Sequence, residues 1–150
     1  LLDDIISKVS IDMLQLHGSE TLTRVREVRM RYGLPIMKAV GIGNASDIKK
    51  AHTYAKVADQ LLLDAKPVAG VDLPGGNGLC FDWGLLRGQT WSIPWMLAGG
   101  LTPENVAAAV KLSGAKQVDV SSGIEMDPGQ KDPKLMARFI QNASAQIVEE

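Results

Sequence analysis

Apolar and polar positions follow two alternating periods along the chain. Short apolar runs, typical of buried strands, occupy residues 11–16, 36–40, 60–63, 95–98 and 117–120. Between these runs the apolar residues recur every three or four positions, which is the spacing of an amphipathic helix. Strands that alternate with helices over short connections form parallel sheets with right-handed crossovers. The pattern therefore predicts an α/β fold with five parallel strands.

Capping residues predict where the helices begin and end. The expected helix starts are, in chain order, Ser19 or Thr21, then Ser46, then Thr102 with Pro103, and finally Asp132 with Pro133. Gly33 and Gly114 are expected to end the helices that follow the first and fourth strands. Two apolar helix faces are expected to pack inward: Leu2, Ile5, Ile6 and Val9 in the first helix, and Leu135, Met136, Phe139, Ile140, Ala143 and Ile147 in the last.

Polar residues near the strand ends distinguish an open doubly wound sheet from a (β/α)8 TIM barrel. Alternate residues of a strand share a face, so His17, Asp64 and Asp119 lie opposite the purely apolar face of their strands. In a barrel these three side chains meet at the C-terminal mouth, where the active sites of this fold lie. An open sheet instead concentrates its site at one switch point, with fewer strands contributing. A (β/α)8 TIM barrel is therefore favoured.

Five strands are too few to close such a barrel, which needs about 200 residues or more. We therefore expect residues 1–150 to be the C-terminal five βα units of a single barrel domain. About 50 or more N-terminal residues, absent from this chain, are expected to precede them. The lack of an initial Met agrees with this expectation.

Two small-residue turns follow the last two predicted strands, Gly99-Gly100 and Ser121-Ser122-Gly123. Counted back from a complete barrel, these strands are the seventh and eighth, whose loops frequently bind phosphate. The backbone amides of Gly100 and Gly123 and the Ser122 hydroxyl are suitable donors to phosphate oxygens. Either turn alone also serves as a simple connection. Their pairing at the expected spacing favours a phosphate site.

Composition and charge argue against some classes of binding partner. The chain is 45% hydrophobic and 22% charged, with a net charge of −1. This balance is that of a globular protein and argues against binding to nucleic acid or to an anionic membrane. No apolar run approaches the roughly 20 residues of a membrane span. The lone Cys80 excludes an internal disulfide and fits a reducing cytosol, so a cytoplasmic location is expected.

Eight short segments stand out along the chain: LQLHG at 14–18, LLDA at 62–65, GGNG at 75–78, FDW at 81–83, LAGGLTPENV at 97–106, VDVSSGIE at 118–125, PG at 128–129 and KD at 131–132. In this order they resemble the phosphoribosylanthranilate isomerase family. Each segment is weak evidence alone, but the ordered set is specific and covers nearly the whole chain. The resemblance implies a (β/α)8 barrel enzyme of tryptophan biosynthesis that needs neither a metal nor an organic cofactor.

The resemblance also implies a reaction and the residues that perform it. The family converts N-(5′-phosphoribosyl)anthranilate to 1-(2-carboxyphenylamino)-1-deoxyribulose 5-phosphate by an Amadori rearrangement. Its general acid is the aspartate that ends the LLD strand, which is Asp64 here. Its general base is a cysteine in a Lys-x-Cys-Gly motif, which these 150 residues do not contain. Cys80 is no substitute, and the chain by itself is expected to be inactive.

The other candidate residues have competing interpretations. His17 is expected in the wall of the active site, either contacting substrate or orienting its neighbours. Asp119 either contacts the ligand or orders the loop of Ser121, which itself is expected to line the mouth. His52 is interpreted as a surface or packing residue. No spacing of histidine, cysteine and carboxylate residues indicates a metal site.

Two alternative functions remain open at this point. One is another phosphosugar barrel enzyme, a synthase or epimerase; the presence of only one lysine inside a predicted strand, Lys38, argues against it. The other is a non-catalytic phosphate-binding or assembly fragment, because an incomplete barrel exposes strand edges. The expected partner is a small phosphoribosyl substrate, and the full-length protein is expected to be a monomer or homodimer.

Overall fold

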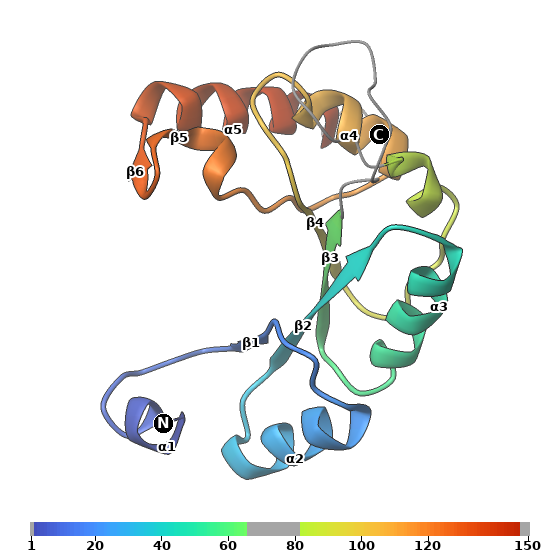
Figure 1. Cartoon of the computed structure of the whole chain (residues 1–150), viewed down its shortest axis with the longest axis vertical. Helices are drawn as coiled ribbons and strands as arrows, with labels where there is room; N and C mark the ends of the chain where they lie inside the picture. Colours follow the sequence, from blue (N-terminus) through green and yellow to red (C-terminus); the bar gives the residue numbers. More distant parts are fainter. Residues whose placement is uncertain (1, 66–81, 148–150) are drawn as a thin grey trace.

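A parallel sheet forms the centre of the computed structural model, which describes residues 2–65 and 82–147. Its four strands lie side by side in chain order (Figure 1): β1 (Leu14–Leu16), β2 (Ile36–Ile42), β3 (Gln60–Ala65) and β4 (Trp95–Ala98). All the pairings between them are parallel. The predicted α/β class with parallel strands is therefore confirmed. The first strand is shorter than the predicted run of residues 11–16.

The predicted fifth strand at residues 117–120 forms only an isolated parallel bridge, between Leu97 and Val118. Two backbone hydrogen bonds hold it to β4: Leu97 N–H donates to Gln117 O at 2.9 Å, and Asp119 N–H donates to Leu97 O at 2.8 Å. Within the described residues this segment has no strand on its other side. The segment therefore runs in the predicted direction without forming a full strand.

Five α-helices accompany the sheet in the described part of the chain: α1 (Leu2–Ile6), α2 (Leu22–Tyr32), α3 (Ala45–Tyr54), α4 (Val106–Ser113) and α5 (Pro133–Ile147). Two 3₁₀ turns are η1 (Trp83–Leu86) and η2 (Ser122–Ile124), and a small hairpin joins β5 (Glu125–Asp127) to β6 (Gln130–Lys131). The elements follow an open arc, with α1 near one end and the hairpin at the other (Figure 1). Among the described residues no helix is long and apolar enough to cross a membrane.

Most of the predicted helix ends have the expected capping geometry. The Thr21 hydroxyl accepts from Arg24 N–H, and Gly33 ends α2 in the left-handed region at φ 65°. Asp132 accepts from Lys134 N–H at 2.7 Å at the start of α5. The predicted Ser46 cap is wrong by two residues, because the Asn44 side chain accepts from the N–H groups of Ser46 and Asp47 and begins α3.

The helix after the Gly-Gly turn begins later than predicted, at Val106 rather than Pro103. Thr102 still acts as a local cap, since its hydroxyl accepts from Glu104 N–H at 3.2 Å. Asn105 stands before the helix and ties the turn together. Its Oδ1 accepts from Thr102 N–H at 2.8 Å, and its Nδ2 donates to Gly100 O at 2.9 Å. Asn105 thus fixes the path of the chain after the two glycines.

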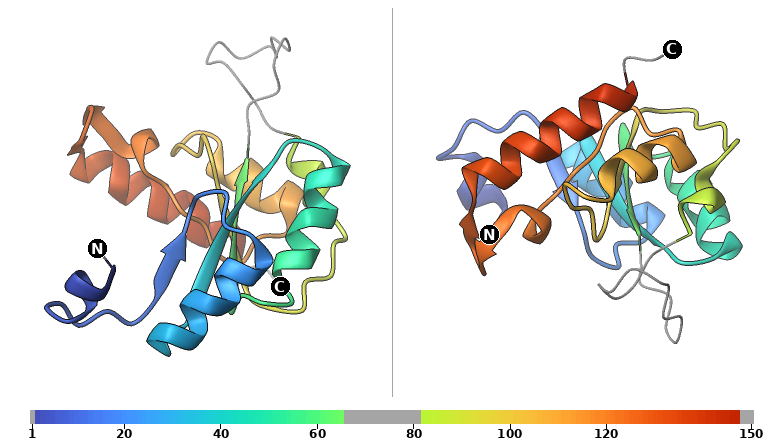
Figure 2. Two further views of the ribbon diagram at one scale, coloured as in Figure 1. Left: turned by 60° about the horizontal axis from the view of Figure 1, so that its bottom comes forward. Right: turned by 90° about the horizontal axis from the view of Figure 1, so that it is seen from above.

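The helices cover one face of the sheet. Ile36, Val40 and Leu63 belong to a large buried cluster that also includes residues of α2, α3, α4 and α5. The opposite face contributes a small cluster of Ala39, Leu62 and Ala98, which contains no helix residue. In both views of Figure 2, α3 and α4 lie on the same side of the strands. Helices on one face are typical of a barrel and not of a doubly wound sheet.

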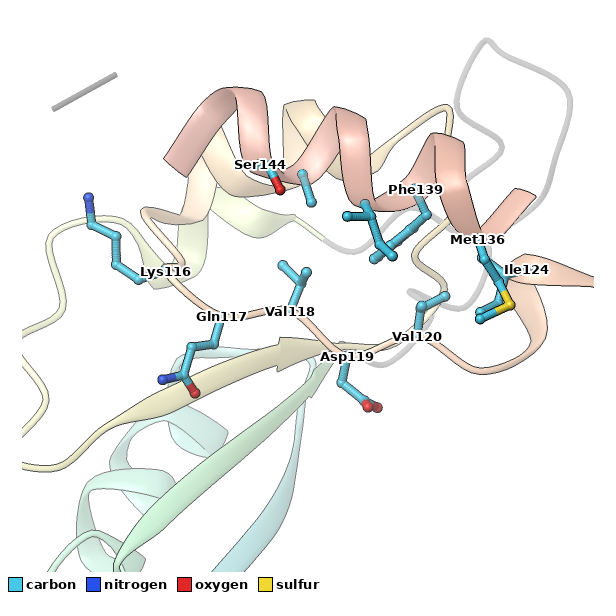
Figure 3. A pocket seen from close by; sticks show the side chains of 11 residues that line it. Lys116, Gln117, Val118, Asp119, Val120, Ile124, Met136, Phe139 and Ser144 are labelled. Atoms are coloured by element: carbon cyan, nitrogen blue, oxygen red, sulfur yellow. The ribbon is translucent and has the colours of Figure 1, made fainter. Parts of the chain in front are cut away.

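Two predicted apolar faces are only partly buried. Helix α1 ends at Ile6, and Val9 beyond it is 53% exposed. On α5, Phe139 and Ala143 are buried as predicted, but Met136 and Ile140 are exposed. These α5 residues and the segment 116–120 line a groove of about 430 Å³ (Figure 3). The inward packing predicted for Met136 and Ile140 is wrong for the described residues, since no described element covers this part of α5.

Candidate active site

His17 and Asp64 meet at the carboxyl ends of β1 and β3, on either side of β2. His17 Nε2 lies 3.5 Å from Asp64 Oδ2, and both side chains remain partly open to solvent, at 57% and 38% exposure. Asp64 has the same strand parity as Leu62, which faces away from the helices. The structure therefore brings these two predicted site residues together, on the face and at the end where a barrel binds its substrate.

A small pocket of about 220 Å³ opens beside this pair. Its lining includes His17, Lys38, Gly41, Tyr54 and Asp64. Carboxyl and imidazole groups at hydrogen-bonding reach of a shared cavity are suited to acid–base chemistry on a bound molecule. No group of three or more histidine, cysteine, aspartate or glutamate side chains suited to a metal is found in residues 2–65 and 82–147.

The sequence did not reveal a buried lysine beneath the His17 turn. Lys38 is 2% exposed and shares its strand parity with Ile36 and Val40, on the helix-covered face of β2. Its Nζ lies 3.0 Å from Glu20 Oε2 and 5.4 Å from the centre of the Tyr54 ring. Lys38 therefore starts from the helix-covered face of β2, although it also lines the pocket beside His17 and Asp64. The available signal was a single lysine within an apolar strand.

Glu20 is held as a carboxylate by its surroundings. Burial alone would raise the pKa of Glu20, but hydrogen bonds from its own backbone N–H, from Lys38 and from Gly18 outweigh burial and lower the pKa below its ordinary value of 4.5. A carboxyl with a lowered pKa in the folded state stabilises the fold at pH values above 4.5. That contribution is lost as the pH falls through the lower, folded-state pKa.

The Glu20→Gln substitution is therefore expected to destabilise the protein in a pH-dependent way. At pH 7 the neutral amide loses the charge-assisted bonds, and we expect a cost on the order of 1.5 kcal/mol. Well below pH 4.5 the parent carboxyl is itself protonated, so the two proteins should differ little in stability. Urea unfolding at neutral and acidic pH measures both differences. An equal cost at the two pH values would contradict the described ion pair.

The two small-residue turns touch each other. Gly99 and Gly100 have positive φ angles of 92° and 60°, which glycine adopts readily. A Cβ atom on Gly123 would lie 1.8 Å from the carbonyl oxygen of Leu101, so the second turn packs directly on the first. The N–H groups of Gly100 and Gly123 donate no hydrogen bond to another described residue. The loops therefore offer unused backbone donors close together.

Lys131 holds the second turn, Ser121-Ser122-Gly123, in place through contacts with Ser121. Its Nζ donates to Ser121 O at 2.9 Å and to Glu125 Oε1 at 2.6 Å, and it lies 3.4 Å from Ser121 Oγ. The pKa of Glu125 lies below its ordinary value, and the hydrogen bond from Lys131 is the largest cause. Ser122 begins the 3₁₀ turn η2 and is exposed. The predicted residues of this turn thus lie in one ordered loop held by a lysine that the sequence analysis did not single out.

Asp119 and His52 occupy different settings. Asp119 is exposed and points away from α5, opposite to Val118 and Val120 (Figure 3). Its carboxylate makes no hydrogen bond to another described residue, so the role of ordering the Ser121 loop is taken by Lys131. His52 stacks on Trp91 with ring centres 4.3 Å apart, as expected for a packing residue. Cys80 and the GGNG segment lie outside the described residues.

Fold and site together define a class of protein: a parallel β/α fold of the barrel kind, with polar side chains and small-residue loops at the carboxyl ends of its strands. The family model for N-(5′phosphoribosyl)anthranilate (PRA) isomerase matches residues 1–142. The chain belongs to this isomerase family.

Individual relatives agree with this assignment. The chain is 56% identical over 145 residues to the N-(5′-phosphoribosyl)anthranilate isomerase of Ruegeria sp. (strain TM1040), covering 96% of this chain and 67% of the relative. It is 58% identical over 142 residues to the isomerase of Cereibacter sphaeroides (strain ATCC 17029 / ATH 2.4.9), covering 95% of this chain and 67% of that one. The chain thus spans about two thirds of the length of these relatives.

Solved structures have the same fold. The crystal structure of phosphoribosyl anthranilate isomerase from Thermotoga maritima matches with a TM-score of 0.75 and 37% identity, covering 95% of this chain and 66% of that chain. A second isomerase structure, at 34% identity and a TM-score of 0.72, is a complex with reduced 1-(o-carboxyphenylamino)-1-deoxyribulose 5-phosphate. It covers 95% of this chain and 64% of that chain. A 3-hexulose-6-phosphate synthase, at 16% identity and a TM-score of 0.58, shares the fold alone.

Proposed function

We propose that the protein converts N-(5′-phosphoribosyl)anthranilate to 1-(2-carboxyphenylamino)-1-deoxyribulose 5-phosphate in tryptophan biosynthesis, in the cytoplasm. Membership in the isomerase family supports the reaction. The observation that carries it in this chain is the Asp64 carboxyl, 3.5 Å from His17 at the carboxyl ends of the strands, on the side of the sheet away from the described helices. An acid in that position can reach a sugar whose phosphate is bound by the neighbouring loops.

Asp64 is proposed as the general acid. It gives its proton to the ribose ring oxygen while the anilino nitrogen donates its lone pair, so that the C1′–O bond breaks and a Schiff base forms. A base then removes the C2′ proton, and the resulting enolamine gains a proton at C1′ and loses its 2′-hydroxyl proton to become the ketone. The base is proposed to be the cysteine of the family motif, contributed from outside residues 1–150.

The phosphate is proposed to bind between the two small-residue turns. Three observations support this: Gly123 packs on Leu101, the N–H groups of Gly100 and Gly123 have no described acceptor, and η2 begins at Ser122. Converging backbone N–H groups form concavities that bind anions. Gly99 and Ser121 complete the two turns, and Asp119 and His17 are proposed to contact polar groups elsewhere on the substrate.

The phosphate site is tested with inorganic phosphate and with a substrate analogue. Crystals grown with phosphate are expected to show the anion between the two turns. An analogue without its phosphate group should bind at least about tenfold more weakly than the phosphorylated form, because it loses charge-assisted bonds of about 1.5–3 kcal/mol each. Equal affinity for the two analogues would contradict the phosphate site while leaving the role of Asp64 to its own test.

The described units are proposed to be the C-terminal part of one (β/α)8 barrel domain. The supporting observations are two strand edges without a described partner, one on β1 and one on the segment 117–120. The groove along Met136 and Ile140 offers apolar surface beside the second of these edges. Preceding βα units would pair with both edges and cover the groove. The full-length protein is proposed to act as a monomer or homodimer on this small-molecule substrate.

A further inference from the structure

The buried Lys38 has no part in the chemistry above, yet it lies directly beneath the His17 turn. We propose that Lys38, paired with Glu20, is a positioning residue that fixes the carboxyl end of β1 and so holds the His17 imidazole against Asp64. The geometric part of this proposal is independent of the reaction. Only its consequence for turnover rests on the proposed role of Asp64.

The hydrogen bonds of Lys38 enclose His17 on both sides. Its Nζ donates to Leu16 O at 3.1 Å and to Gly18 O at 2.9 Å, the carbonyl groups on either side of His17. The third bond goes to Ala39 O at 2.8 Å, within β2 itself. An ammonium group has three hydrogens, and here the three carbonyl groups and the Glu20 carboxylate share them. One side chain of β2 therefore fixes the carbonyl groups of both residues next to His17.

Glu20 closes the same turn from its other end. Its two carboxylate oxygens accept from Gly18 N–H at 3.2 and 3.1 Å, and Oε2 lies 3.0 Å from Lys38 Nζ. Tyr54 of α3 donates its hydroxyl to Glu20 O at 2.7 Å. The turn from residue 16 to residue 20 is thus tied to both β2 and α3.

Little else in the described structure holds the end of β1. The strand has three residues and pairs with β2 alone. The His17 side chain is 57% exposed, so packing does not fix its orientation. Burying a charge is unfavourable unless it is paired, and a buried ion pair adds little net stability. We therefore attribute the burial of Lys38 to the geometry that it imposes on His17 and not to a gain in stability.

The test measures the coupling between His17 and Asp64 without relying on activity. Residues 1–150 contain two histidines, His17 and His52, and their imidazole NMR signals in the full-length protein are assigned by substituting each in turn. In the parent protein, Asp64→Asn is expected to shift the signals of His17 and leave those of His52 unchanged. In a Lys38→Met background, which keeps the length of the side chain, we expect most of that response to be lost. An undiminished His17 response would overturn the proposal.

A matched control separates positioning from general destabilisation. Asp59 anchors the opposite end of β2, where it accepts from Ile36 N–H at 2.9 Å and from Arg29 Nη2 at 2.6 Å. Asp59→Asn should destabilise the fold but retain the response of His17 to Asp64→Asn. Loss of the response in this variant as well would show that stability alone is responsible and would refute the positioning role.

A second variant covers the case in which Lys38→Met does not fold. Glu20→Gln keeps all three carbonyl bonds of Lys38 but removes the carboxylate. It is expected to weaken the His17 response, and an unchanged response would contradict the part assigned to the pair. Turnover by Asp64→Asn tests the proposed function separately, since the NMR coupling stands whether or not Asp64 is the acid.

Discussion

Replacing Asp64 with asparagine is expected to remove most of the isomerase turnover while substrate binding survives. Asparagine has nearly the shape of aspartate and keeps a hydrogen-bonding group beside His17, which lies 3.5 Å from the carboxylate. Its amide is far too weak an acid to protonate the ribose ring oxygen. General acid catalysis contributes roughly a hundredfold to ten-thousandfold, so kcat should fall by a factor on that order. Initial rates and equilibrium binding of a product analogue measure the two effects.

Two further variants make this result specific. Asp119→Asn removes the other carboxylate assigned to the site, and it should raise KM more than it lowers kcat. His52→Gln changes an imidazole that stacks on Trp91 and should leave both constants close to those of the parent. A collapse of turnover in Asp119→Asn with normal turnover in Asp64→Asn would move the acid role from Asp64 to Asp119.

The Gly123→Ala substitution is expected to force the two turns apart. Its Cβ atom would lie 1.8 Å from the carbonyl oxygen of Leu101, and 3.2 Å from the Thr102 Cα. Both neighbours are backbone atoms that cannot rotate away. Overpacking of this kind costs about 1–3 kcal/mol. We expect this loss of stability together with a fall of about tenfold or more in affinity for the phosphorylated analogue.

Gly33→Ala provides the matched control. Gly33 ends α2 at φ 65°, and nothing lies within 4 Å of the position that a Cβ would take. The substitution therefore costs stability through backbone strain alone, about 1–2 kcal/mol. It should leave affinity for the phosphorylated analogue unchanged. If Gly33→Ala and Gly123→Ala weakened binding equally, the contact between the turns would have no special role in binding.

The elements whose signals are local were predictable from the sequence. Thr21 caps the start of α2 and Gly33 caps its end, as expected, because a cap depends only on residues close to it in the sequence. The start of α4 was misplaced because Thr102 caps a local turn, and the helix begins only at Val106, after Asn105. Residues 117–120 have the pattern of a strand. Ladder pairing needs neighbours, however, and one edge of this segment has none in the described structure.

The site likewise contains residues that a local pattern predicted and residues that only tertiary contacts bring together. Strand parity was enough to expect His17 and Asp64 on one face, and the structure brings them together. The network of Lys38, Glu20 and Tyr54 was not predictable, because it joins β2, the turn after β1 and α3 through tertiary contacts. A lysine in an otherwise apolar strand indicates that some buried partner exists. It does not identify that partner.

The central claim is tested most directly by identifying what the protein, as its native gene encodes it, makes from N-(5′-phosphoribosyl)anthranilate. Chromatography with mass spectrometry and comparison with an authentic standard distinguishes the isomeric product from the substrate. The unaltered protein is predicted to form 1-(2-carboxyphenylamino)-1-deoxyribulose 5-phosphate, and Asp64→Asn to form almost none in the same time. Unchanged substrate with the unaltered protein, or equal product from both proteins, would contradict the account.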